Sequence, residues 1–139
     1  FDHASGWQDK GVGDLNSRHI YFRKIKVKND GRRIMALTEF GGYSFAMKEH
    51  VFTKKLFGYK GFKNPDDLIN AYENLYQNEI FPAIKNDGLG ATVYTQVSDV
   101  EDEVNGLYTY DRVLKVDENR IKAINEKLYK IFDENIHKN

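Results

Sequence analysis

The stretch that decides the fold reads Ile34-Met35-Ala36-Leu37-Thr38-Glu39-Phe40-Gly41-Gly42. Its first five residues form a short apolar run bounded by charge, which is typical of a strand buried on both faces of a parallel sheet. Glu39 follows the run, and α/β folds bind ligands at the carboxyl ends of such strands. The stretch therefore predicts a buried strand with a functional carboxylate at its end. A structural ion pair between Glu39 and a Lys or Arg is the alternative.

Segments on either side of this stretch alternate between strand and helix patterns. Residues 19–22 and 91–95 are rich in β-favouring side chains and predict two more strands. Asn64 is a good N-cap for a helix that Pro82 should kink or end, and residues 118–136 have the apolar spacing of a second helix. This alternation indicates an α/β fold with a parallel sheet and favours a (β/α) barrel. A full barrel needs roughly 250 residues, so this chain supplies about half.

Composition excludes several classes of function. The 139 residues include 21 Lys and Arg and 21 Asp and Glu, and this zero net charge argues against a nucleic-acid binder. The absence of cysteine excludes disulfides, thiolate metal sites and cysteine nucleophiles. No apolar run is long enough to predict a membrane span. Aromatic residues make up 14% of the chain, a load that a sugar-binding site would use.

Three further side chains are candidates for a site near Glu39. His19 and Tyr21 are two residues apart and would share one face of a strand, where Tyr21 could bond a carboxylate and His19 a substrate hydroxyl. Trp7 lies in a glycine-rich loop, where an exposed indole would offer a stacking platform. Ordinary packing is the alternative for each of them.

Residues 98–103 form an acidic run with four carboxylates within five residues. The run lacks the turn glycine and the alternating spacing of a calcium loop, so it predicts no metal site. Crowding of like charges could raise one pKa for catalysis. On pattern alone a solvated acidic loop is preferred, in which Glu101 or Asp102 bonds Arg112 or a backbone amide.

Taken together, these residues resemble a known family. Residues 38–44 resemble the nucleophile strand of glycoside hydrolase family 2, the group of β-galactosidases, β-glucuronidases and β-mannosidases. Residues 93–112 resemble the last barrel strand and its loop in bacterial members, and this long acidic segment is the most specific part. Residues 2–7 and the pair Gly13-Asp14 also look like that family, so the resemblance covers nearly the whole chain.

The resemblance implies that residues 1–139 are the C-terminal half of a catalytic (β/α)8 TIM barrel, from about strand five to helix eight. Retaining glycosidases use a pair of carboxylates, and Glu39 matches the nucleophile. Tyr21 matches a tyrosine that positions the nucleophile. His19, Trp7 and Tyr94 would be substrate-side residues, although many relatives have Trp where this chain has Tyr94.

The family's acid/base is a Glu that follows an Asn on strand four, and no pair here fits that role. Asn78-Glu79 lies in a predicted helix, and Asn125-Glu126 and Glu134-Asn135 lie in the last one. We therefore expect the acid/base, with the rest of the barrel and the sandwich domains, to lie upstream of Phe1. The piece alone should be nearly inactive, since general acid catalysis is worth about 10²–10⁴-fold.

Two other functions remain open. One is a non-catalytic carbohydrate-binding module that stacks sugars on Trp7, Tyr94 and Tyr43, and the other is a protein-interaction domain that uses residues 98–103. The leading hypothesis, a retaining β-glycosidase, implies a β-glycoside substrate and no cofactor, metal, nucleic acid or membrane partner. Exposed edges of a half barrel would favour a homo-oligomer. The lack of cysteine and of a signal peptide favours the cytoplasm.

Overall fold

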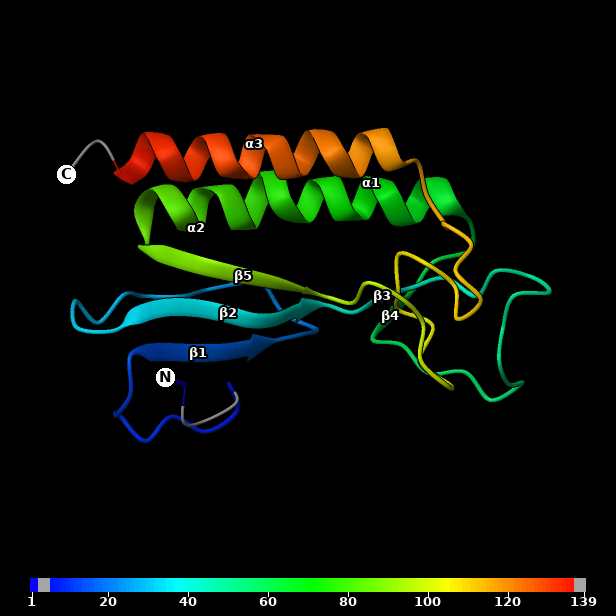
Figure 1. Ribbon diagram of the computed structural model, residues 1–139, viewed down its shortest axis with the longest axis horizontal. Coiled ribbons are helices and arrows are strands. Elements are labelled where there is room, and N and C mark those ends of the chain that lie inside the picture. The colour runs from blue at the N-terminus through cyan, green and yellow to red at the C-terminus, as the bar shows by residue number, and fades with distance from the viewer. Residues whose placement is uncertain (3–5, 137–139) are drawn as a thin grey trace.

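The structure is a computed structural model that describes residues 1–2 and 6–136. Short strands come first, a helical segment follows, and a last strand and a long helix complete the chain (Figure 1). The elements are β1 (Leu15–Ile20), β2 (Ile34–Gly41), β3 (Tyr43–Ser44), β4 (Lys60–Gly61), α1 (Pro65–Leu75), the π-helical η1 (Tyr76–Ile80), α2 (Phe81–Asn86), β5 (Leu89–Thr95) and α3 (Glu118–Ile136).

The main sheet has the strand order β1-β2-β5, and both pairings are parallel. Strands β3 and β4 form a separate parallel pair beyond the carboxyl end of β2. Figure 1 shows α1, α2 and α3 together on one side of the sheet, with the N-terminal segment beside β1. The carboxyl ends of the three parallel strands point toward the long loops, so residues that follow the strands lie at one end of the molecule.

The expectation of half a (β/α)8 TIM barrel, from strand five to helix eight, is wrong. In the described residues the sheet is open, has three strands and carries its helices on one face. The connection from β1 to β2 contains no helix, whereas a barrel alternates strand and helix throughout. The molecule is a small α/β domain. One helical crossover between parallel strands is common to both architectures, so the sequence pattern did not separate them.

The hydrophobic core lies between the sheet and the helices. Phe40 of β2 is fully buried there, and its ring contacts those of Tyr76 and Tyr94. Asn64 caps α1 as predicted, because its side chain accepts the backbone N–H of Asp67. The helices contribute Leu68, Ile69, Tyr72, Ile84, Ile124 and Ile131 to this core, with Ile121, Leu128 and Phe132 packed at its edge.

The predicted effect of Pro82 appears as a change of helix type. The chain widens into the π-helical turn η1 directly before α2, and Pro82 then occupies the first turn of α2. Because proline has no backbone N–H and clashes with the carbonyl four residues earlier, a wider turn accommodates it without ending the helical segment. The predicted helix therefore continues to Asn86 as three consecutive segments.

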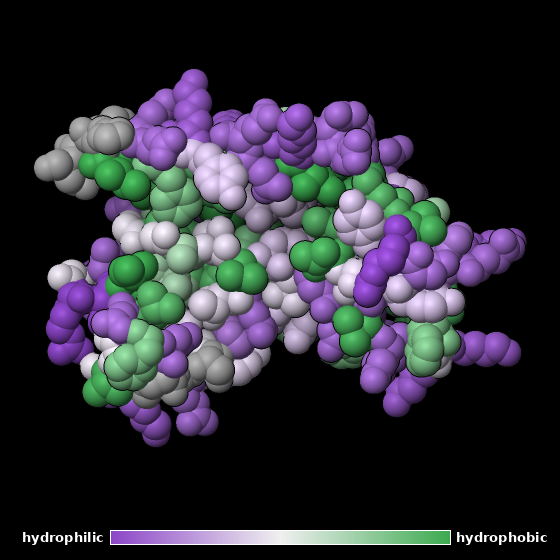
Figure 2. Space-filling view, viewed as in Figure 1, coloured by the Kyte–Doolittle hydropathy of each residue, from purple (hydrophilic) through white to green (hydrophobic). Residues whose placement is uncertain are grey.

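The outer surface of the helical layer is hydrophilic, as Figure 2 shows along α3. Hydrophobic residues gather between that layer and the N-terminal segment, over the strands. None of the helices in residues 6–136 has the length and apolar character that crossing a bilayer requires.

Candidate functional site

Glu39 is placed by an irregularity near the end of β2. Arg18 of β1 is paired with Leu37, but the next residue, His19, is paired with Glu39, so Thr38 is an extra residue in the register. Such a bulge re-aims the side chains that follow it. It brings Glu39 opposite His19 on the neighbouring strand, with 41% of the Glu39 side chain exposed.

Two side chains from the end of β1 approach the same carboxylate oxygen. Tyr21 donates its hydroxyl to Glu39 Oε2 at 3.0 Å, and His19 Nδ1 lies 3.2 Å from that oxygen. His19 Nδ1 has no partner of hydrogen-bond geometry among the described residues, although its side chain is only 7% exposed. Burial, together with the bond to Glu39, raises the pKa of Tyr21, so Tyr21 stays a neutral donor.

Gly6 allows the N-terminal segment to approach the His19 ring. Its φ is +79°, and a Cβ at this position would lie 2.0 Å from His19 Cδ2. The carbonyl of Gly6 accepts the backbone N–H of His19, and the next residue, Trp7, then lies edge-on to the His19 ring with 5.1 Å between centroids. The Trp7 residue is 64% exposed, so its indole is available for stacking at the side of the carboxylate.

Tyr59 is a site residue that the sequence did not reveal. Its ring stacks on Tyr21 with 3.9 Å between centroids and 5° between planes. A Cβ on Gly42, where φ is +62°, would lie 2.4 Å from Tyr59 Cδ2, so this glycine makes the stack possible. Tyr59 comes from an irregular loop with no periodic pattern, and the only signal was the second glycine after Glu39.

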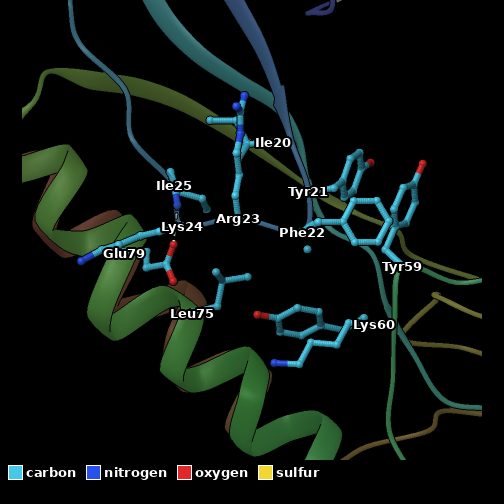
Figure 3. Close-up of a pocket in the computed structure, with 12 residues that line it drawn as sticks. Ile20, Tyr21, Phe22, Arg23, Lys24, Ile25, Tyr59, Lys60, Leu75 and Glu79 are labelled. Carbon is cyan, nitrogen blue, oxygen red and sulfur yellow. Dashed lines mark hydrogen bonds between the residues drawn. The ribbon is translucent and has the colours of Figure 1, made fainter.

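A cavity of about 410 Å³ borders the stacked tyrosines on their helix side. Figure 3 shows Leu75 and Glu79 across this cavity, while the hydroxyls of Tyr21 and Tyr59 point away from them. Glu79 Oε2 accepts the backbone N–H of Ile25 at 2.6 Å. The pair Asn78-Glu79 is therefore engaged on the helix side, away from the Tyr21 hydroxyl that bonds Glu39.

Tyr94 packs away from Glu39, and Tyr43 lines the cavity on the helix side of the stacked tyrosines. Tyr94 packs its ring against Tyr72 of α1, with 4.9 Å between centroids, and its buried hydroxyl has no hydrogen-bond partner in the described chain. Tyr43 packs edge-on against Phe62, and Lys60 lies 5.5 Å from the Tyr43 ring centre. The structure thus brings Glu39, Tyr21, His19 and Trp7 together and places Tyr94 in the packing under α1.

The acidic run is divided by the fold. Asp99 is buried and accepts the ammonium of Lys115, whose side chain is fully buried, at 2.7 Å. Burial raises the pKa of Asp99 and lowers that of Lys115, and their hydrogen bond opposes both shifts. Glu101 is exposed with φ at +53°, while Glu103 accepts Gln96 Nε2 at 3.2 Å. The prediction of a solvated acidic loop is therefore correct for Glu101 and wrong for Asp99.

The site has the chemistry of a half-exposed carboxylate held by the hydroxyl of Tyr21. Within residues 1–2 and 6–136, no group of three His, Asp or Glu side chains could hold a metal ion. The motif positions His3, Ala4 and Ser5 lie outside the described residues. A carboxylate that is fixed by Tyr21 and flanked by an exposed indole can act as a nucleophile or as a hydrogen-bond acceptor for a sugar.

Comparison with models of known protein families finds no match to the chain. Comparison with curated proteins finds no match either.

Proposed function

We propose that the chain provides the nucleophile of a retaining β-glycosidase and that Glu39 is this nucleophile. The observation that carries the proposal is the hydrogen bond from Tyr21 to Glu39 at the carboxyl end of a parallel strand, with His19 Nδ1 3.2 Å from the same oxygen. The motif resemblance to glycoside hydrolase family 2 supports the same assignment. The geometric argument does not depend on a barrel, since open α/β sheets also bind ligands outside the carboxyl ends of their parallel strands.

The reaction would proceed in two displacements. A Glu39 oxygen attacks the anomeric carbon, the bond from that carbon to the leaving oxygen breaks, and the leaving oxygen takes the electron pair and a proton from an acid. Water then attacks the same carbon, loses a proton to a base, and regenerates the carboxylate. Tyr21 orients Glu39 in both steps, and Trp7 stacks on the sugar ring.

We do not propose Glu79 as the general acid, because its carboxylate accepts the Ile25 N–H on the helix side. A decisive test must therefore work without protonation of the leaving group. Dinitrophenolate departs without a proton, so 2,4-dinitrophenyl β-galactoside, β-mannoside and β-glucuronide report the first displacement alone.

The experiment is a rapid-mixing measurement of dinitrophenolate release by the whole chain. We expect a burst of up to one equivalent per chain with at least one of the three glycosides, and no burst with Glu39→Gln. The amide keeps the size of the side chain and can still accept the Tyr21 hydroxyl, so the fold should remain. Glu126→Gln, a change of an exposed carboxylate on α3, is the matched control and should keep the burst.

A wild-type chain that gives no burst with any of the three glycosides would refute the assignment. A burst that persists in Glu39→Gln would do so as well. Sugar binding without a burst would instead identify a carbohydrate-binding module.

A further inference from the structure

The acidic loop is held in one shape by contacts inside it. Val100 and Glu103 exchange backbone hydrogen bonds of 3.2 and 2.9 Å, which close a tight turn. Phe57 donates its N–H to Asp102 and accepts that of Val104, so the loop pairs with the segment that carries Tyr59. The buried Lys115 bonds Asp99 and also the Val104 carbonyl. These contacts fix the position of the Glu103 backbone.

The Glu103 side chain is part of a row of polar side chains formed by Gln96, Glu103 and Asn105. Gln96 Nε2 donates to Glu103 Oε2 at 3.2 Å and to Asn105 Oδ1 at 2.5 Å. Asn105 is fully buried, and its Nδ2 has no partner among the described residues. Gln96 directly follows β5, the strand next to β2. The row therefore lies at the same edge of the sheet as Glu39.

Aromatic rings connect this row to Glu39. Phe57 lies edge-on to Tyr59 with 5.3 Å between centroids, and Tyr59 stacks on Tyr21. Burial raises the pKa of the Tyr59 hydroxyl, and the charges of Glu103 and Glu39 raise it further. The loop that carries Glu103 and the tyrosine pair that holds Glu39 are therefore joined through Phe57 and Tyr59.

A separate observation also points to a ligand at this edge. His19 is buried except for 7% of its side chain, and its Nδ1 is unpartnered 3.2 Å from Glu39 Oε2. Buried polar atoms in proteins are normally satisfied, and a hydroxyl group can accept from one nitrogen and donate to a carboxylate at once. The edge therefore offers several separate hydrogen-bonding points around an aromatic surface, which is what a polyhydroxylated ring requires.

We propose that Glu103 and Gln96 are specificity-determining residues that bind hydroxyl groups of a neutral sugar beside Glu39. This inference rests on the proposed function and adds the substrate class. Glu103 would accept from a sugar hydroxyl, and Gln96 orients Glu103. Glu39 and Glu103 would both lie beside the bound sugar and would repel a sugar that carries its own carboxylate. Neutral hexosides are therefore preferred over hexuronides. The expected preference is at least about tenfold, because repulsion between two unit charges at 4 Å is worth about fivefold in bulk water and far more near a protein surface.

The test is equilibrium binding, which does not need turnover. Saturation-transfer NMR titrations of the whole chain would use methyl β-galactoside, methyl β-mannoside and methyl β-glucuronide. We expect one or both neutral sugars to bind at least about tenfold more tightly than the glucuronide. Glu103→Gln should weaken neutral-sugar binding and narrow this preference, because the charge is lost while the shape remains. Gln96→Leu, which leaves the Glu103 charge in place, should weaken neutral-sugar binding by loosening Glu103.

Glu101→Gln is the matched control, since Glu101 is exposed on the same loop and its change should alter neither affinity nor preference. The inference is overturned if no neutral hexoside binds, if the glucuronide binds as tightly, or if Glu103→Gln behaves like the control. Thermal unfolding of each variant identifies any that fail to fold. Binding with the expected pattern but without a dinitrophenolate burst would refute the nucleophile alone, and a burst with unchanged Glu103→Gln binding would refute the specificity role alone.

Discussion

Replacing Lys115 by Met should lower the free energy of unfolding far more than any substitution at the surface. The Lys115 side chain is fully buried and that of Asp99 is 3% exposed, so within the described residues the variant leaves a buried carboxylate with the Gly106 N–H as its remaining partner. Removing one member of a buried ion pair costs about 3–5 kcal/mol. For a chain of this size, that corresponds to a fall in Tm of about 10–20 °C. The Val104 carbonyl keeps its bond from the Phe45 amide, so the cost falls on Asp99.

The effect should also depend on pH with a defined sign. Burial already raises the pKa of Asp99, and loss of the Lys115 ammonium raises it further. The folded variant then binds more protons than the unfolded chain between the ordinary aspartate pKa of about 3.9 and the raised value. Its stability is therefore lost as the pH rises through that window, and Lys115→Met is more damaging at pH 7 than at pH 4.

Chemical denaturation followed by circular dichroism at these two pH values measures both effects. Lys122→Met, which removes an exposed lysine 3.9 Å from Glu126, is the control and should cost less than about 1 kcal/mol. Adding Asp99→Asn to Lys115→Met should recover part of the loss, because the uncompensated charge is removed. The reasoning is refuted if Lys115→Met costs no more than the control, or if its cost is the same at both pH values.

Two further changes test other parts of the structure. Gly42→Ala should destabilise the chain and alter the near-UV dichroism of the tyrosine stack, because its Cβ would lie 2.4 Å from Tyr59; Gly11→Ala, with φ of +72° and no atom within 4 Å, should show only the backbone cost of about 1 kcal/mol. Equal effects in the two variants would contradict this. Backbone N–H groups of Arg33 and Arg32, together with the Arg33 guanidinium, lower the pKa of Asp30 to about 2, so stability is lost as pH falls below about 3.9 toward that value. Asp30→Asn should flatten this part of an acid titration of unfolding, and an unchanged titration would contradict the role of Asp30.

The local elements could be predicted from the sequence because their signals are local. Asn64 and the apolar spacing after residue 118 specify helix ends and helix faces, and the apolar run before Glu39 specifies a strand. The architecture could not be predicted in the same way. Whether three parallel strands close with others into a barrel or remain an open sheet depends on contacts between distant segments, and alternation of strand and helix is identical in both cases.

The contact of Tyr21 with Glu39 could be predicted, because the carboxyl ends of neighbouring parallel strands lie at the same end of the sheet. The bulge at Thr38 was not predictable from spacing, and neither was the stack of Tyr59 on Tyr21, which depends on a positive φ at Gly42. Tyr94 packs on the helix side because the register of β5 directs its ring toward Tyr72.

The most direct test of Glu39 as nucleophile is to trap its ester. In a 2-deoxy-2-fluoro β-glycosyl fluoride, the 2-fluorine slows both displacements while fluoride departs without a general acid, so the glycosyl ester accumulates. The chain would be incubated with galactosyl and mannosyl forms, digested, and mapped by mass spectrometry. The account predicts one fluorosugar per chain, on the peptide that contains Glu39, and none in Glu39→Gln. No adduct, or an adduct on another carboxylate such as Glu103, would contradict it.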